Sequence, residues 1–273
     1  MRAPRDRVAL LGLVVITASV LLAAVAPALA PADPVKNDLL ARLTPPMWMD
    51  GGSAHHPLGT DTLGRDVVSR LLYGARVSLV VGFSAVILAG ALGVVLGLVA
   101  GYYGGRIDDA LMRLGDVQLA FPALVLAIAV LAVVGSGLGN VVLVLGVTGW
   151  VTYARIARGE TLSLRHREFV EGARALGARD AAILWRHVLP NVLPALLDAV
   201  GPVATALLAG SFAAERVFGL PYFGQLYVLA VLQKQVAVVV VTTTTFAAMV
   251  AAVGLGVELV RVSVDPRVRE GAQ

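Results

Sequence analysis

The run VQLAFPALVLAIAVLAVVGSGLGNVVLVLGVTGWVTYA, residues 117–154, holds 38 consecutive residues without a charged side chain. A helix needs about 20 apolar residues to cross the roughly 30 Å hydrocarbon core of a bilayer. The run is therefore too long for one crossing and only just long enough for two. Its cluster of glycine, serine and asparagine, residues 135–140, supplies the turn between them. We predict a tight helical hairpin embedded in a membrane.

Uncharged or nearly uncharged runs recur along the rest of the chain, at residues 8–32, 77–105, 192–214 and 236–257. Together with the hairpin they predict an all-α, polytopic membrane protein with six transmembrane helices. The composition agrees, because 58% of the 273 residues are hydrophobic and 15% are charged, with a mean hydropathy of +0.83. These values exclude an ordinary soluble enzyme and a disordered chain. The first run has a second interpretation, a signal peptide cleaved after Ala28-Leu29-Ala30.

A row of small residues marks one face of the second predicted span. Ala89, Gly93, Gly97 and Gly101 follow one another at steps of four residues. Residues spaced in this way lie on the same side of a helix, and small side chains allow a second helix to approach closely. We expect this row to be a helix–helix contact.

Basic residues are distributed unequally between the two sides of the six-span arrangement. The N-terminus, the C-terminus and the loops after spans two and four carry fifteen Lys and Arg residues, against seven on the other side. The positive-inside rule puts the larger set in the cytoplasm. Residues 31–76 then form an external loop, and residues 155–190 a cytoplasmic segment. Arg155 and Arg158 are expected to end the fourth span by snorkelling to the interface. We interpret the net charge of +4 as a membrane-topology signal rather than a sign of nucleic-acid binding.

The sequence contains neither a phosphate-binding Gly-x-x-x-x-Gly-Lys-Ser/Thr loop nor a His-Glu-x-x-His motif. We therefore expect no catalysis and no bound cofactor or metal in this chain, and an energy source in a partner or an ion gradient. His55 and His56 are adjacent, but no third ligand lies near them in sequence. We interpret them as a solvated pair rather than a metal site.

The cytoplasmic segment has the pattern of two short helices with a hinge. Phe169, Ala173 and Leu176 share one helical face, while acidic and basic residues occupy the others, so the first helix is amphipathic. Gly177 is expected to end it. Asp180 then caps a second helix, and Pro190 stops that helix before the fifth span. Taken alone, such a helix more often lies on the membrane surface than inserts its apolar side into a protein groove.

The spacing in this segment resembles the EAA motif of binding-protein-dependent ABC importer permeases. In that motif Glu-Ala-Ala is followed after three residues by Gly and, thirteen residues later, by Pro in a Leu-Pro pair. The matching positions here are Glu171, Ala173, Gly177, Leu189 and Pro190. Gly172 replaces the first alanine, which loosens a helix slightly, and His187 stands where many members have Ile.

A second resemblance lies in the external loop, in HPLGTDTLGRD at residues 56–66. It is similar to the signature that precedes the second span in C-type permease subunits of dipeptide and oligopeptide importers. Gly59 and Gly64 allow turns, and Asp61 can bond its own backbone. Val67, Leu71 and Leu72 give the next segment an apolar side, which we expect to lie along the outer interface. The signature positions are Gly59, Thr60, Asp61, Gly64, Arg65 and Asp66.

The two resemblances imply the fold of a type I ABC importer permease. An N-terminal helix and external loop (1–76) would precede the permease domain (77–273), whose loop 155–190 couples to an ATPase. Such a subunit works in the inner membrane with a second permease, two cytoplasmic ATPases that bind the ATP, and an extracytoplasmic binding protein. The helix 168–177 would be a lever seated in the ATPase. The coupling residues implied are Glu168, Phe169, Glu171, Gly172, Ala173, Leu176, Gly177, Leu189 and Pro190.

The translocation path is less clearly marked in the sequence. Asp198 is a carboxylate within the fifth span, where it faces either protein or water. Thr242 and Thr243 belong to a run of four threonines that can either bond back to helix carbonyls or face a pore. The resemblance implies a peptide cargo, with nickel complexes, glutathione or oligosaccharides as alternatives. An ion-coupled secondary transporter is the competing function class.

Overall fold

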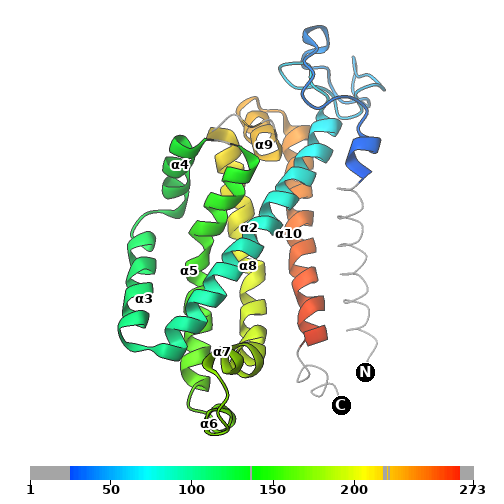
Figure 1. Cartoon of the computed structure of the whole chain (residues 1–273). Helices are drawn as coiled ribbons and strands as arrows, with labels where there is room; N and C mark the ends of the chain where they lie inside the picture. Colours follow the sequence, from blue (N-terminus) through cyan, green and yellow to red (C-terminus); the bar gives the residue numbers. More distant parts are fainter. Residues whose placement is uncertain (1–24, 136, 218–219, 221, 265–273) are drawn as a thin grey trace. The chain divides into compact units, whose positions relative to one another are not determined.

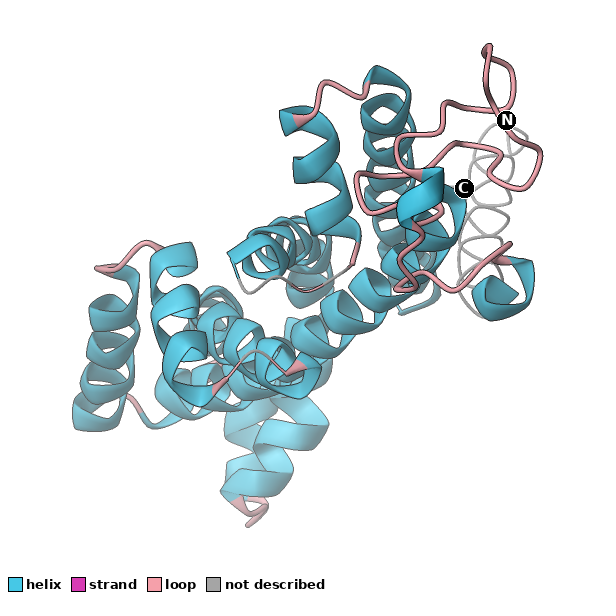
Figure 2. Cartoon of the chain, turned by 90° about the horizontal axis from the view of Figure 1, so that it is seen from above, coloured by secondary structure: helices cyan, strands magenta, loops and turns pink. Residues whose placement is uncertain are grey.

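A computed structural model describes residues 25–135, 137–217, 220 and 222–264 of the chain. Helices dominate this part (Figures 1 and 2), and β-type pairing within it is limited to two isolated bridges in the loop that precedes the first long helix. The expectation of an all-α protein is confirmed. The helical elements are η1 Leu39–Ala41, α2 Val67–Tyr103, α3 Gly105–Leu119, α4 Ala123–Val134, α5 Leu138–Leu164, α6 Glu168–Ala175, α7 Asp180–Ile183, η2 Leu184–Val188, α8 Leu189–Val217, α9 Phe223–Leu232 and α10 Val236–Val264.

Four stretches of the described chain are long and apolar enough to cross a membrane: α2, α5, the continuous helix Asp180–Val217, and Val236–Val257 of α10. A fifth crossing is present if α3 and α4 form one broken span, since the two helices meet at 89°. Residues 8–24, about two thirds of the first predicted span 8–32, lie outside the described residues. The membrane-embedded helical fold is thus confirmed, whereas the count of six is not.

Helix α2 begins earlier than predicted. It runs for 37 residues from Val67, so the lead-in expected to lie along the outer interface is instead the first part of the same helix. Val67 is completely buried. The charged residues Arg70 and Arg76 had marked this stretch as loop, but a helix longer than the hydrocarbon core can carry them beyond the apolar run.

The predicted hairpin of residues 117–154 is correct in its turn and wrong in its first arm. The chain does turn between α4 and α5, near Gly135 and Gly137. The first arm, however, is broken at Phe121 and Pro122, and the charged stretch before it is itself the helix α3. Proline restricts the residue before it to extended backbone, which ends α3 just ahead of Pro122.

Pro190 does not end a helix as predicted. It is the second residue of α8, and helix continues through it from Asp180 to Val217. A π-helical turn, η2, precedes it, and the Leu189 N–H bonds to the Leu184 carbonyl five residues back. A π-helical turn is wider than an α-helical turn. The proline ring therefore avoids the clash with a preceding carbonyl that it would have in a regular α-helix.

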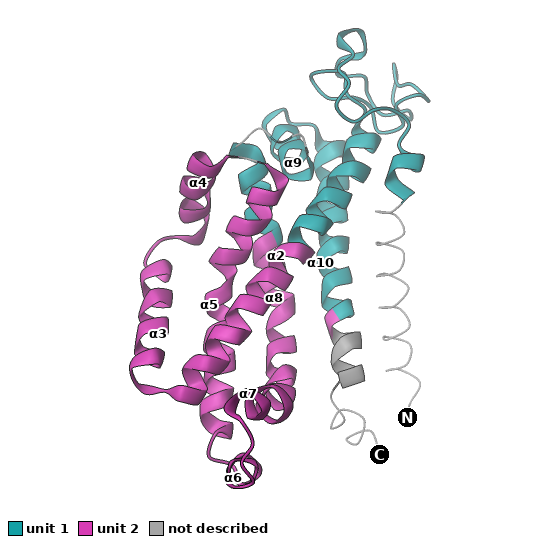
Figure 3. Ribbon diagram, viewed as in Figure 1, with its two compact units in different colours: residues 1, 3–82, 208–256 teal, residues 2, 83–207, 257–273 magenta. Residues whose placement is uncertain are grey.

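The described chain divides into two compact units (Figure 3): residues 25–82 with 208–256, and residues 83–207 with those from 257 onward. In the second unit the row of small residues packs on α5, which confirms the expected helix–helix contact. A methyl group added to Gly93 would lie 2.6 Å from Tyr153 Cβ, and one added to Gly97 would lie 2.7 Å from Ala157 Cβ. The backbones of α2 and α5 therefore approach closely because these side chains are missing.

The first unit packs the N-terminal part of α2 against α9 and α10. Its buried cluster contains Val67, Leu226, Ala230 and Val238. The rings of α8, α9 and α10 meet at Phe212, which lies 5.2 Å from Phe223 and 4.7 Å from Phe246 between ring centroids.

Candidate functional site

The first candidate site is the segment of α6 and α7 in the second unit. Helix α6 has Glu168 and Glu171 in its first turn and Arg174 in its last, the arrangement that complements the helix dipole. It ends in a Schellman turn, because the Gly177 N–H bonds to the Arg174 carbonyl at 3.0 Å and the Ala178 N–H to the Ala173 carbonyl at 3.1 Å. Gly177 has a φ of +80°. The prediction that this glycine ends the helix is confirmed.

The apolar side chains of α6 point in two directions. Val170 is fully buried against the rest of the chain, and Ala173 is half-buried. Phe169 is 42% exposed and Leu176 90% exposed. The predicted apolar face is thus turned largely away from this chain, so α6 presents uncovered apolar surface. Glu168, Glu171 and Gly172 are exposed as well.

A tyrosine of α2 connects the two sides of the turn after α6. The Arg174 guanidinium donates to the Tyr102 hydroxyl oxygen at 3.2 Å, and that hydroxyl donates to the Asp180 carboxylate at 2.7 Å. The hydrogen bond with Tyr102 raises the pKa of Arg174 further above its already high value, so the guanidinium stays charged. The prediction that Asp180 caps α7 is wrong: the N-cap is Arg179, and no side chain caps it. The carboxylate is instead the acceptor for Tyr102.

Two arginines that were expected to end the fourth span lie inside α5, which continues to Leu164, and they have partners that the sequence did not indicate. Arg155 pairs with Asp116 at 2.6 Å, and Arg158 pairs with Asp108. Both carboxylates belong to α3, so these side chains pair with a neighbouring helix, and their snorkelling to the interface stays a prediction. Leu189 and Pro190, the other predicted coupling positions, begin α8, where Leu189 is half-buried and Pro190 is exposed.

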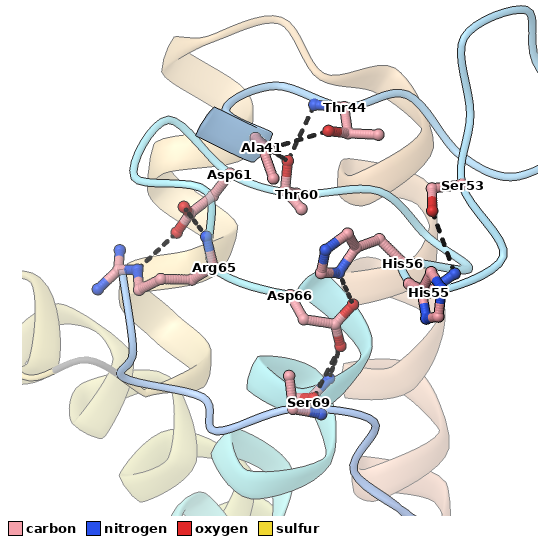
Figure 4. A network of polar contacts seen from close by, with 11 residues as sticks. Ala41, Thr44, Ser53, His55, His56, Thr60, Asp61, Arg65, Asp66 and Ser69 are labelled. Atoms are coloured by element: carbon pink, nitrogen blue, oxygen red, sulfur yellow. Dashed lines mark hydrogen bonds and ion pairs between the residues drawn. The ribbon is translucent and has the colours of Figure 1, made fainter. Parts of the chain in front are cut away.

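The second candidate site is the signature loop of the first unit, and Asp61 is its centre (Figure 4). The Asp61 carboxylate accepts from the backbone N–H groups of Leu63 at 2.8 Å and Arg65 at 3.0 Å, as the sequence predicted. It also forms ion pairs with Arg65 Nε at 2.8 Å and with Arg70 Nη1 at 2.6 Å. Arg70 is 1% exposed, so a carboxylate and two guanidinium groups share a buried site. Gly59 and Gly64 make the turns expected of them, with φ of +80° and +72°.

The remaining signature residues fix the ends of the loop. The Thr60 hydroxyl donates to the Ala41 carbonyl and accepts from the Thr44 N–H. Asp66 directly precedes α2 and caps it, since its carboxylate accepts from both the N–H and the hydroxyl of Ser69 at 2.7 Å.

His56 was expected to be solvated, without a nearby carboxylate. In the structure its Nδ1 lies 3.1 Å from Asp66 Oδ1, as Figure 4 shows. The signal was present in the sequence, because an acidic residue directly before a helix is a common N-cap. What the sequence did not show was that the loop folds back over ten residues to bring His56 beside it.

The translocation-path candidates do not share one environment. Asp198, on α8, is exposed on this chain. Thr242, on α10, is fully buried, and its hydroxyl donates to the carbonyl of Val238 at 2.7 Å. Thr243 is exposed. The back-bonding expected for the threonine run is found at Thr242, Thr244 and Thr245. A role of Asp198, Thr242 and Thr243 in a path stays a prediction.

Glu215 is a buried polar residue that the sequence did not single out. It is 3% exposed, near the end of α8. One carboxylate oxygen accepts from the Gly224 N–H at 2.6 Å and the other from the Ser78 hydroxyl at 3.3 Å. Because Gly224 lies in the first turn of α9, this carboxylate stabilises the positive end of that helix.

Comparison with known proteins identifies two family models along the chain. Residues 93–270 match the model described as binding-protein-dependent transport system inner membrane component. Residues 3–46 match that of the N-terminal TM domain of oligopeptide transport permease C. The second match covers most of the residues that the structure does not describe at the N-terminus.

Relatives in several bacteria are similar to the chain over most of its length. The di/tripeptide transport system permease protein DppC of Pseudomonas aeruginosa is 34% identical, with 97% of this chain and 89% of the relative covered. The dipeptide transport system permease protein DppC of Alkalihalophilus pseudofirmus is 40% identical, with 75% of this chain and 66% of the relative covered, just under two thirds of its length. The glutathione transport system permease protein GsiD of Pectobacterium atrosepticum is 45% identical over 54% of this chain and 49% of its own.

The fold is also similar to that of a solved transporter. A chain of the MetNI methionine ABC transporter, crystallised in inward-facing conformations, superimposes with a TM-score of 0.62, covering 70% of this chain and 94% of that one. The sequence identity is 18%, so this likeness concerns the fold alone. It confirms the expected fold of an ABC importer permease.

Proposed function

Because the chain belongs to the family of binding-protein-dependent transport system inner membrane components, we propose that it is the permease subunit of an ATP-driven importer of dipeptides and oligopeptides. The cargo is inferred from the relatives, whose names specify dipeptide or di/tripeptide transport, and from the match to an oligopeptide permease model at the N-terminus. The chain would supply part of the path through the membrane.

The observation that carries the proposal is the uncovered apolar surface of α6. Phe169 and Leu176 are exposed on a short, charged helix outside the long apolar stretches. Two large apolar side chains on such a helix fit a groove on a partner protein. We assign that groove to a cytoplasmic ATPase, with Glu171 pairing a basic group or a helix end inside it and Gly177 at the base of the moving segment.

The subunit would work in an assembly of defined composition. A second, homologous permease completes the path, two ATPases bind and hydrolyse the ATP, and an extracytoplasmic binding protein delivers the cargo to the outer face. The chain lies in the inner membrane, with both termini in the cytoplasm. This orientation is supported by the excess of Lys and Arg on the side that carries α6.

Co-purification from detergent-solubilised membranes tests the proposal. The tagged chain should be isolated with an ATPase whose hydrolysis rises when loaded binding protein is added. Glu171→Lys should reduce both ATPase recovery and transport, since it reverses a charge on the docking helix. Asp50→Lys reverses an exposed charge in the external loop and is the matched control. Normal assembly and transport in Glu171→Lys would show that α6 is not part of the ATPase interface.

Glutathione is the second candidate cargo, since relatives named for glutathione transport match the chain with high identity over about half of its length. The cognate binding protein distinguishes the two. Its melting temperature should rise with dipeptides and tripeptides across several sequences if peptides in general are the cargo. A rise with glutathione alone would assign the importer to glutathione.

A further inference from the structure

Helix α6 packs against α7 and η2 in the second unit, and two of its side chains are held there. Val170 is the one buried side chain among its eight residues. The second attachment is polar: Arg174 reaches Tyr102 of α2, with its guanidinium carbon 5.6 Å from the centre of the tyrosine ring. A force applied to the exposed face of α6 therefore reaches the rest of the unit through these two contacts and through the chain itself.

The chain connection alone is a weak link for such a force. Gly177, at φ +80°, is exposed, and residues of this kind at the end of a helix can absorb large changes in backbone angle. Part of the motion of α6 would then be lost at this turn before it reached α7. A contact that transmits the motion of α6 to α7 has to hold the two sides of the Gly177 turn together.

Tyr102 makes contact with both sides of the Gly177 turn. Its hydroxyl accepts from Arg174, which precedes the turn, and donates to Asp180, which follows it. Two hydrogen bonds through one oxygen strengthen each other. Tyr102 is itself held, because it is 8% exposed and Arg165 donates to the neighbouring Gly101 carbonyl at 3.2 Å.

We propose that Tyr102 is a positioning residue that fixes the angle between α6 and α7, so that displacement of α6 is passed to the continuous helix of α7, η2 and α8. This inference rests on the proposed function, in which an ATPase moves α6. Asp180 is the first residue of that helix, which runs without interruption to Val217. Whatever holds Asp180 to α6 therefore holds a membrane-spanning helix to α6.

The two hydrogen bonds that join Arg174 and Asp180 through the Tyr102 hydroxyl form a bridge across the Gly177 turn. Tyr102→Phe tests this bridge, because it removes the hydroxyl and keeps the ring. In the assembled importer, the ratio of binding-protein-stimulated to basal ATPase activity should fall by about two- to tenfold, the range expected for the loss of one hydrogen bond or two. Basal hydrolysis and ATPase recovery should stay unchanged. Tyr103→Phe is the matched control, since Tyr103 is half-exposed and touches Tyr102 ring to ring at 5.2 Å. A wild-type ratio in Tyr102→Phe would overturn the proposal.

A pair of substitutions at Asp180 distinguishes loss of the hydrogen bond to Tyr102 from a general loss of stability. Asp180→Asn keeps an oxygen that accepts from Tyr102 and should retain most of the stimulation. Asp180→Leu has a similar size but no acceptor and should behave like Tyr102→Phe. Equal effects of the two substitutions would show that the hydrogen bond to Asp180 does not transmit the motion, and would overturn the proposal.

A distance measurement tests the angle without any ATPase. The chain has no cysteine, so spin labels can be placed at Ala175→Cys and Ala181→Cys, both exposed and on either side of the turn. The distance distribution in the purified full-length chain should broaden in Tyr102→Phe and stay narrow in Tyr103→Phe. An unchanged distribution would contradict the bridge. Failure of the wild-type chain to bind an ATPase would instead contradict the proposed function.

Discussion

At the scale of single residues, the buried charges around Asp61 have the largest expected effect on stability. Asp61 is the carboxylate paired with both Arg65 and Arg70. Asp61→Asn keeps the size of the side chain but leaves two buried guanidinium groups without a counter-charge. Removing one partner of such a site costs about 3–5 kcal/mol. The purified chain should melt at a clearly lower temperature in detergent, whereas Asp50→Asn, in an exposed position, should match the wild type.

A double substitution identifies the cause of that loss. Arg70→Met in the Asp61→Asn background removes the most deeply buried of the orphaned charges and leaves an apolar chain of similar length. Replacing a buried ion pair by apolar groups is often close to neutral. Partial recovery of the melting temperature is therefore expected. If the double variant melts below Asp61→Asn, the guanidinium of Arg70 has a stabilising role apart from this carboxylate.

Residue contacts were predictable from the sequence only where they are local. The Asp61 bonds to residues 63 and 65 follow from the side chain's own reach. The Tyr102 bond to Asp180 joins residues 78 positions apart, and the Glu215 bond to Ser78 joins residues 137 apart. Such pairs depend on how the helices pack, and no spacing in the sequence encodes them.

At the scale of helices, the close approach of α2 and α5 gives a matched pair of substitutions. Gly97→Ala and Gly90→Ala each add one methyl group to α2, and each gains about 1 kcal/mol in helix propensity. At Gly97 the methyl would lie 2.7 Å from Ala157 Cβ, whereas at Gly90 nothing lies within 4 Å. Overpacking of this kind costs about 1–3 kcal/mol. Gly97→Ala should therefore lower the melting temperature, and Gly90→Ala should leave it unchanged or raise it.

The comparison of the two alanines also tests the packing of this pair of helices. If both variants melt at the wild-type temperature, α2 and α5 are further apart than the structure shows. The row of small residues was predictable because residues four positions apart lie on one face of a helix wherever that helix begins or ends. The helix ends themselves were not predictable: α2 starts ten residues before its uncharged run, at Val67, since charges mark where the membrane ends rather than where a helix does.

Pro190 shows why breaks within an element are hard to predict. Both Pro122 and Pro190 follow an apolar residue, yet α3 has ended before Pro122 while helix continues through Pro190. The difference lies in the π-helical turn ahead of Pro190, which adjusts the backbone before the ring. Such a turn depends on the packing of buried residues such as Leu184 and Val188, which a proline rule does not include.

At the scale of the whole molecule, the apolar runs and the two motifs were enough to predict the fold class, because membrane crossing requires about 20 apolar residues in helical form. They were insufficient for the arrangement of α3 and α4. A run of 38 uncharged residues is long enough for two straight spans. It is equally compatible with one straight span, α5, preceded by the second half of a broken span, α4. The choice depends on contacts such as the Trp150 ring N–H with Gln118, at 2.8 Å, which fasten the end of α3 to α5.

The orientation in the membrane is the last prediction, and the absence of cysteine makes it directly measurable. Leu176→Cys introduces a thiol on α6, where the native side chain is 90% exposed, and Asp50→Cys introduces one in the loop before α2. A membrane-impermeant maleimide should label Asp50→Cys in intact cells and Leu176→Cys only in inverted membrane vesicles, because the positive-inside rule predicts that the side with fifteen basic residues faces the cytoplasm. Labelling of Leu176→Cys in intact cells would place α6 outside, where no ATPase could reach it, and the coupling role of α6 would have to be abandoned.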